Sequence, residues 1–232
     1  GGKTHLQEFS QIDVEMSMVT QEEILEIIEQ YIQFIFKKIL DVDINIPFPR
    51  LDYVELCKKF NVDDPAKALA MGKNRKKMKT YQIEKWDFTW IINFPYATKD
   101  SKGQFVPVHH VMSRPKNYYD AWNKELDKII CSGYDLMVNG IEIAGGDLRI
   151  YDYEQQKILL ERLKYNKEQI SEMYEPLLKG LAEAMPPHGG FAFGLERLAM
   201  ILANTDNIAN VVAFPKSISC RDEFFKSPTK LK

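Results

Sequence analysis

The segment from residue 185 to residue 202 combines features that suit the binding of an anion. Its hydrophobic pattern changes from a period of two to a helical period, which indicates a strand that leads directly into a helix. Three glycines would let a flat ligand lie against the backbone: Gly189, Gly190 and Gly194. Arg197, in the first expected helical turn, adds a permanent cation beside a helix N-terminus. A glycine-rich turn with an arginine in a surface ion pair would give the same pattern.

Two acidic residues stand in strand patterns that are otherwise apolar. Asp135 and Glu142 lie in the segment from residue 134 to residue 150, which is expected to form two consecutive strands. A glycine-permitted irregularity separates the two strands. Because a buried carboxylate is costly without a partner, each residue requires a cation. A metal ion, or an ion pair with Arg149 or a nearby lysine, would provide it.

The segment from Phe9 to Val19 alternates between apolar and polar residues, as in a strand with one buried face. The buried face is expected to carry Ile12, Val14, Met16 and Met18. The opposite face carries Gln11, Asp13 and Glu15. This polar row forms either a solvated surface or the floor of a polar pocket, and the pattern alone favours the solvated surface.

His109 and His110 follow an expected hairpin, in which a strand at residues 86–95 is joined by a turn to a partner strand at residues 104–108. Neighbouring residues on a strand point to opposite faces, so at most one of the two histidines lies on a given pocket wall unless the backbone bends. The pair is therefore a poor metal site. Two core or surface histidines are the simplest interpretation.

In this order, these segments resemble the class II aminoacyl-tRNA synthetases, in the form found in bacterial-type aspartyl-tRNA synthetases. The run from Gly189 to Arg197, with the later segments 204–208 and 213–216, is similar to the third signature motif of that family. The run from Glu8 to Ser17 is similar to the strand that closes the second motif. The resemblance extends over nearly the whole chain.

The resemblance implies an ATP site with magnesium. In the family, the residue that matches Arg197 lies against the ATP phosphates, and glycines that match Gly190 and Gly194 give the adenine a flat surface. The positions that match Asp135 and Glu142 hold magnesium against the phosphates. Arg197 and Glu142 thus take the catalytic roles, as fixed charges rather than as acids or bases.

The resemblance also implies a site for L-aspartate. The residues that match Gln11 and Asp13 face the ammonium group of the amino acid, and one histidine of the pair His109 and His110 contacts the substrate carboxylate. The arginine that matches Arg149 clamps the side-chain carboxylate of aspartate with two hydrogen bonds, a geometry that lysine does not reproduce.

The expected function is that of an aspartate–tRNA ligase, which forms aspartyl-adenylate from ATP and transfers the aspartyl group to tRNA(Asp), as a homodimer. The alternatives are an asparaginyl-tRNA synthetase, a relative that makes asparagine from the same adenylate, or an inactive regulatory paralogue. Arg149 argues against asparagine as the substrate. The sequence lacks the glycine-rich loop of a P-loop ATP site.

The elements that must position these residues form an α+β fold, and the resemblance implies an antiparallel sheet flanked by helices. A capping box at Thr20 and Glu23 starts a helix that is expected to end at Asp41. A short helix is expected from about Asp52 to Phe60. Two further helices are expected at residues 152–163 and 167–184, and the second ends at a pair of prolines.

Residues 1–232 correspond to part of a class II catalytic domain. The first motif, the arginine-bearing first half of the second motif and the anticodon-binding domain have no match in the sequence. We therefore expect a longer gene product, in which a strand carrying an arginine precedes Gly1.

Composition agrees with one mixed domain, since 45% of the 232 residues are hydrophobic and 28% are charged. A net charge of -2 gives no overall polycation for nucleic acid, so RNA contact would depend on local patches. Residues 73–79 carry five cations, which indicates a solvated surface or an RNA contact. Three widely spaced cysteines favour a reducing cytoplasm, and the sequence contains no apolar run that would span a membrane.

Overall fold

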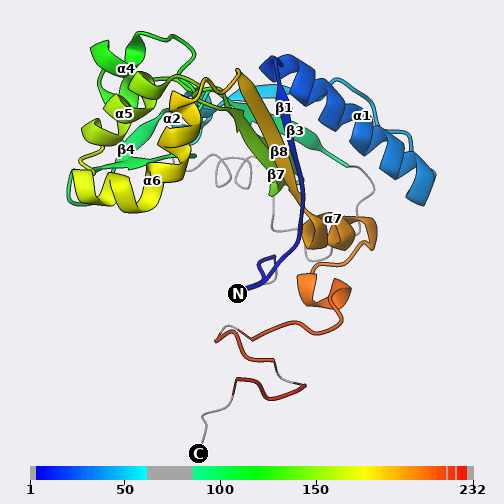
Figure 1. Ribbon diagram of the computed structural model, residues 1–232. Coiled ribbons are helices and arrows are strands. Elements are labelled where there is room, and N and C mark those ends of the chain that lie inside the picture. The colour runs from blue at the N-terminus through cyan, green and yellow to red at the C-terminus, as the bar shows by residue number, and fades with distance from the viewer. Residues whose placement is uncertain (1–3, 62–85, 218, 223, 229–232) are drawn as a thin grey trace, which may run out of the picture.

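A six-stranded sheet forms the centre of the protein, as the computed structural model shows for residues 4–61, 86–217, 219–222 and 224–228 (Figure 1). In spatial order the strands are β1 (Gln11–Ser17), β8 (His188–Gly194), β7 (Ile141–Leu148), β6 (Gly133–Val138), β3 (Phe88–Ile92) and β2 (Arg50–Asp52). All neighbours are antiparallel except β2 and β3, which are parallel. The predicted α+β fold with an antiparallel sheet flanked by helices is confirmed.

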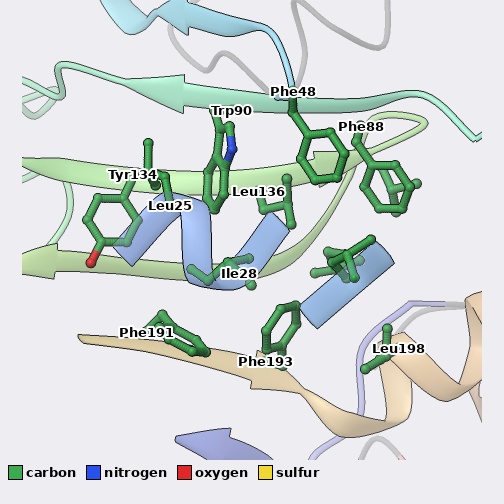
Figure 2. Close-up of a cluster of buried hydrophobic side chains, with 14 of the residues drawn as sticks. Leu25, Ile28, Phe48, Phe88, Trp90, Tyr134, Leu136, Phe191, Phe193 and Leu198 are labelled. Atoms are coloured by element: carbon green, nitrogen blue, oxygen red, sulfur yellow. The ribbon is translucent and has the colours of Figure 1, made fainter. Parts of the chain in front are cut away.

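Helix α1 (Gln21–Leu40) covers one face of the sheet. It begins at the predicted capping box, where the Thr20 hydroxyl accepts a hydrogen bond from the Glu23 amide and the Glu23 carboxylate accepts one from the Thr20 amide. It ends at Asp41, which adopts the left-handed conformation of a helix C-cap. Its apolar stripe packs on Trp90, Tyr134 and Phe193, and the buried core lies between helix and sheet (Figure 2).

A buried acid ties the segment before β2 to this core. The side chain of Glu29, in the middle of α1, is 2% exposed and accepts hydrogen bonds from the Trp90 indole, the Phe48 amide and the Arg50 guanidinium. These three partners meet the need of a buried carboxylate for hydrogen bonds and for a countercharge. Glu29 therefore fixes the extended segment that leads from Phe48 into β2.

The remaining elements lie around the sheet. They are α2 (Tyr53–Phe60), β4 (Ala97–Lys99), β5 (Phe105–Pro107), α4 (Asp120–Asn123), a 3-10 turn η2 (Leu126–Lys128), α5 (Tyr153–Arg162), α6 (Lys167–Ala182), α7 (Leu195–Leu202) and a 3-10 turn η3 (Ile208–Val211). Helix α7 packs beside α1, and its Leu198 and Ile201 join the same core. Helices α4, α5 and α6 lie on the other side of the molecule (Figure 1). The helices predicted at residues 52–60, 152–163 and 167–184 agree with α2, α5 and α6 to within two residues at each end.

The predicted hairpin is wrong in its pairing. Strand β3 does not pair with the strand that follows the turn but lies in the main sheet between β2 and β6. The turn joins β4 to β5, which form a separate two-stranded sheet. The chain leaves β3 at Asn93, where the backbone has a positive φ of 64°, and Pro95 follows, so the strand does not continue to the turn.

Met18 is a second correction. It was expected on the buried face of the first strand, but β1 ends at Ser17, and Met18 has a φ of 56° and is 73% exposed. The left-handed conformation turns its side chain out of the alternating pattern.

The basic run at residues 73–79 lies outside the described residues. Within the described ranges, no helix is both long and apolar enough to span a membrane.

Candidate functional site

The face of the sheet that points away from α1 is polar. In the register of β1 with β8, Gln11, Asp13 and Glu15 lie opposite Gly194, Ala192 and Gly190, respectively. The register continues across the sheet, because Gly190 pairs with Asp147 on β7 and Ala192 with Gly145, which in turn pairs with Asp135 on β6. Cross-strand partners share a face, so side chains from β1, β7 and β6 line one surface. The polar row predicted on the first strand therefore lies on the floor of a polar site.

Asp147 is the buried centre of this surface. Its side chain is fully buried, and Oδ2 accepts a hydrogen bond from Ser113 Oγ at 2.6 Å and lies 2.9 Å from His110 Nδ1 and 3.1 Å from His109 Nδ1. Its other oxygen, Oδ1, lies 2.7 Å from Arg149 Nη1. Burial raises the pKa of Asp147, but the hydrogen bonds from the two histidines and the charge of Arg149 outweigh it and hold this pKa well below its usual range.

Both histidines lie on the same wall, so the alternation expected for neighbouring strand residues does not hold here. Strand β5 ends at Pro107 and the chain bends at residues 108 and 109, which brings the His109 and His110 rings to a centroid separation of 4.3 Å. His109 Nε2 lies 3.3 Å from Asp135 Oδ1, so each of its ring nitrogens faces a carboxylate. Burial lowers the pKa of His109, but the hydrogen bonds to Asp135 and Asp147 raise it overall, to about 9.

His109, His110 and Asp147 have ligand atoms within 4.8 Å of one another, which is a possible metal spacing. The Asp147 carboxylate, however, is already engaged by the Ser113 hydroxyl and by the guanidinium of Arg149. A second cation there would face the charge of Arg149 at close range. The cluster is therefore better described as a hydrogen-bonded network than as a metal centre.

Arg149 lies at the end of β7, and two carboxylates hold it. In addition to its ion pair with Asp147, it donates from Nη2 and Nε to Glu15 Oε1, at 2.7 Å and 3.2 Å. Burial lowers the pKa of Arg149, but these two carboxylates raise it overall. The alternative that Arg149 pairs with Asp135 or Glu142 is wrong, since its carboxylate partners are Asp147 and Glu15.

Arg197 lies at the opposite end of the β1 row. Its Nη1 donates to the backbone oxygen of Glu142 at 2.9 Å and lies 3.5 Å from Glu142 Oε2, and its Nε donates to the Thr4 carbonyl at 3.2 Å. A cavity of about 230 Å³ adjoins it, and the wall of this cavity includes Gln11, Glu142, Gly194 and Arg197. Two predicted ATP-site residues, Gly194 and Arg197, thus share a cavity with Glu142.

The start of α7 is fastened to β1. The carboxylate of Glu196 accepts both of its hydrogen bonds from the Ser10 amide, at 2.9 Å and 3.0 Å, and the Leu195 amide donates to the Ser10 carbonyl. These bonds satisfy the backbone groups of Ser10, immediately before β1, and bring a helix N-terminus to the cavity. The turn that carries Arg197 is therefore fixed to the strand that carries Gln11.

The two predicted metal ligands differ in exposure. The Asp135 side chain is 21% exposed and that of Glu142 is 50% exposed, so the expectation that Glu142 is buried is wrong. Its partner is Arg197. Desolvation and then the charge of Asp135 raise the pKa of Glu142, and Arg197 opposes this in part. Two carboxylates that repel each other, with oxygen ligands only, suit a hard divalent cation such as Mg²⁺.

Glycine occupies different positions on this surface for different structural reasons. A Cβ on Gly190 would lie 2.1 Å from the Val14 carbonyl oxygen, and one on Gly145 would lie 2.6 Å from Asp135 Oδ1. At Gly190 the obstacle is the backbone of the neighbouring strand, so close strand packing requires glycine there, whereas at Gly145 it is the end of the Asp135 side chain. A Cβ on Gly194 would meet its nearest atom, in Arg197, at an ordinary 3.7 Å. Gly194 therefore keeps the cavity side of the strand open rather than relieving a clash.

The structure brings the predicted site residues onto one surface, in two groups. Gln11, Glu142, Gly194 and Arg197 surround the cavity, while His109, His110 and Arg149 surround Asp147, and Asp13 lies on the β1 row between the two groups. The sequence analysis did not single out Asp147, Ser113 or Glu196. The rule that drew attention to Asp135, an acid within an apolar strand, applies equally to Asp147 between Gly146 and Leu148 and would have identified it.

Comparisons with known proteins agree with this architecture. The sequence profile described as tRNA synthetases class II (D, K and N) matches residues 2–218. The aspartate–tRNA(Asp/Asn) ligase of Caldanaerobacter subterraneus is 27% identical, with 90% of this chain and 55% of that protein covered. The aspartate–tRNA ligase of Buchnera aphidicola is 38% identical over 62% of this chain and 25% of its own length. The chain thus spans about half the length of the first of these relatives and a quarter of the length of the second.

Two solved structures share the fold. The aspartyl-tRNA synthetase of Entamoeba histolytica superposes with a TM-score of 0.71 at 21% identity and covers 96% of this chain and 46% of its own. The asparaginyl-tRNA synthetase of the same organism, in complex with asparaginyl-adenylate, has a TM-score of 0.69 at 20% identity and covers 94% of this chain and 49% of its own.

Proposed function

We propose, from the premise that this chain belongs to the tRNA synthetases of class II (D, K and N), that the polar face of its sheet activates L-aspartate with ATP and passes it to tRNA(Asp). The observation that carries the proposal is the spacing of two cations. Arg149 contacts Glu15 at one end of the β1 row, and Arg197 shares a cavity with Gln11 at the other. Four residue steps along the strand, from Gln11 to Glu15, correspond to about 13 Å, the scale of an amino acid joined to a nucleotide.

At the Arg149 end, the guanidinium would bind the side-chain carboxylate of aspartate. Its charge, its planar donors and the two histidines beside it suit a carboxylate better than a neutral amide. Asp13, in the middle of the row, and Gln11, at its far end, would receive the ammonium group. The arrangement explains why the proposal favours aspartate over asparagine.

At the Arg197 end, the cavity would hold ATP. Arg197 would pair with its phosphates after leaving Glu142, and Gly194 would border the base. Gly190, the other glycine predicted at the ATP site, lies opposite Glu15, toward the Arg149 end of the row. Asp135 and Glu142 would hold Mg²⁺, which supplies charge neutralisation for the phosphates when it is bound. Fixed charges on both sides of the reacting atoms would then stabilise the transition state without a proton-transferring side chain.

The family relationship also leads us to propose that the functional unit is a cytoplasmic homodimer. The length and assembly of the purified gene product, measured by mass spectrometry and by sedimentation, test this part. A gene product that is monomeric and fully active would contradict it.

ATP–pyrophosphate exchange tests the proposed activity directly. We expect exchange by the full chain that depends on magnesium and on aspartate, with little exchange in the presence of asparagine or without an amino acid. Exchange driven by asparagine would favour the asparaginyl alternative. The absence of exchange together with tight binding of ATP or RNA would favour a regulatory paralogue.

A further inference from the structure

We propose that Asp147 is the positioning residue of the amino-acid end of the site: it holds His109 and His110 by contacts with their ring nitrogens and Arg149 by an ion pair, and thereby sets the affinity for a substrate carboxylate. The inference rests on the proposed function, because it names the residue that prepares the same site. Asp147 itself would not touch the substrate.

Most of the Asp147 carboxylate is engaged. Oδ2 faces Ser113, His110 and His109, and Oδ1 faces Arg149 at 2.7 Å. Oδ2 therefore has its full set of neighbours, whereas Oδ1 has the ion pair with Arg149 but no well-aligned hydrogen bond in the described part of the chain. Since the side chain is also fully buried, neither a substrate nor a metal ion reaches it without breaking the network.

Asp147 joins side chains from two parts of the chain. Arg149 follows it at the end of β7, whereas the histidines lie in the irregular segment after β5. Backbone contacts fix this segment on both sides of the histidines, from the Val108 amide to the Tyr96 carbonyl and through the bridge between Ser113 and Arg149. Asp147 contacts both histidine rings and Arg149, while Asp135 contacts the ring of His109 as well.

Glu15 provides a natural contrast. Both acids pair with Arg149, but the Glu15 side chain is 44% exposed and uses a single oxygen, whereas Asp147 is buried and uses both. A substrate carboxylate that reaches Arg149 therefore displaces Glu15 and leaves Asp147 in place. Two acids on one arginine thus have opposite roles, since Asp147 prepares the guanidinium and Glu15 competes for it.

Matched amide variants test this contrast. Asp147→Asn places amide hydrogens against donors, so we expect the KM for aspartate to rise by about tenfold or more. Glu15→Gln removes the competing charge, so the KM for aspartate should stay equal or fall. The KM for ATP and kcat should change little in Asp147→Asn if the variant is folded, which a thermal melt checks. Equal losses of aspartate and ATP affinity in Asp147→Asn, or a KM for aspartate that is unchanged, would overturn the proposal.

A measurement on the unaltered protein tests the network without activity. His110 Nδ1 lies 2.9 Å from Asp147 and 3.5 Å from Arg149 Nη1, so it either donates to the acid or accepts from the arginine. The proposal requires a proton on Nδ1, which nitrogen-15 NMR of the histidine ring detects, with His188 as an internal comparison because its Nδ1 faces the Pro186 carbonyl. A bare Nδ1 on His110 would overturn the proposal. If exchange with aspartate fails while this proton is present, the proposed function fails and the network stands.

Discussion

The two faces of the central sheet are built from the same strands in different ways. On β8, Phe191 and Phe193 point into the core under α1, while Gly190, Ala192 and Gly194 face the polar site between them. The apolar face needs only volume and hydrophobicity, which several residues supply together. The polar face needs particular partners, because each buried charge must meet its own counterpart. One face therefore stabilises the fold through many contacts, and the other prepares chemistry through few.

The largest loss of stability should come from a substitution on the apolar face. Phe193 is fully buried and its ring contacts both Tyr31 and Phe191, so Phe193→Ala should lower the free energy of unfolding by about 3–5 kcal/mol. The control is Asp13→Asn, which lies on the polar side of the neighbouring strand and should cost no more than about 0.5 kcal/mol. Urea unfolding measures both. Similar losses in the two variants would remove the distinction between the faces.

Arg149→Leu should affect recognition more than folding. Loss of its charge and donors should remove roughly 3 kcal/mol or more of the discrimination for aspartate over asparagine, while ATP binding is retained. Arg149→Lys should restore only part of it, because an ammonium group does not form two parallel hydrogen bonds. Titration of each ligand separately is the measurement. Equal loss of ATP and aspartate binding would mean that Arg149 supports the fold or the nucleotide instead.

The pH dependence of stability should show the charged network of the polar face. The pKa of His109 is raised from 6.5 to about 9. The contribution of His109 to the free energy of unfolding is therefore complete below pH 6.5 and is lost as the pH rises through 9. The loss in the metal-free protein should be at most about 3 kcal/mol. Urea unfolding across this range should show it in the unaltered protein and not in His109→Gln. The same slope in both proteins would refute this role of His109.

The smallest expected change in stability is at Glu142. Desolvation and the nearby Asp135 raise the pKa of Glu142, so the folded protein destabilises the ionised form of this side chain. Glu142→Gln should therefore leave the melting of the ligand-free protein unchanged within about 0.5 kcal/mol, or raise it. Magnesium-dependent binding of ATP should weaken in the same variant. A marked loss of stability without ligand would instead identify Glu142 as the structural partner of Arg197.

The same contrast decides what the sequence could predict. The capping box of α1, the alternation of β1 and the period change at β8 are local patterns. Helix α1 begins at its predicted cap and β8 leads directly into α7, whereas β1 lies within its predicted segment but ends before Met18. The partner of β3 was predicted wrongly, because β3 pairs with β2 and β6, which lie far from it in the sequence, and the turn joins β4 to β5 instead. Local patterns therefore gave the elements more accurately than their partners.

The candidate site shows this limit more clearly. The resemblance gave the types of residue, but the alternation rule alone would have separated His109 from His110, and the rule for an acid in an apolar strand would have marked Asp147 without its partners. Asp147 depends on a bend after β5 and on a serine 34 positions earlier in the chain. Such a network has no period, so only the assembled fold shows which acid is paired with which cation.

The most direct test of the central claim is a crystal structure of the full chain with a stable analogue of aspartyl-adenylate. We predict that the aspartyl carboxylate lies on Arg149 in place of Glu15, that the phosphate lies toward Arg197, and that Asp147 keeps its four partners. An analogue bound away from this face, or one whose side-chain carboxylate avoids Arg149, would contradict the claim that the polar face recognises aspartate.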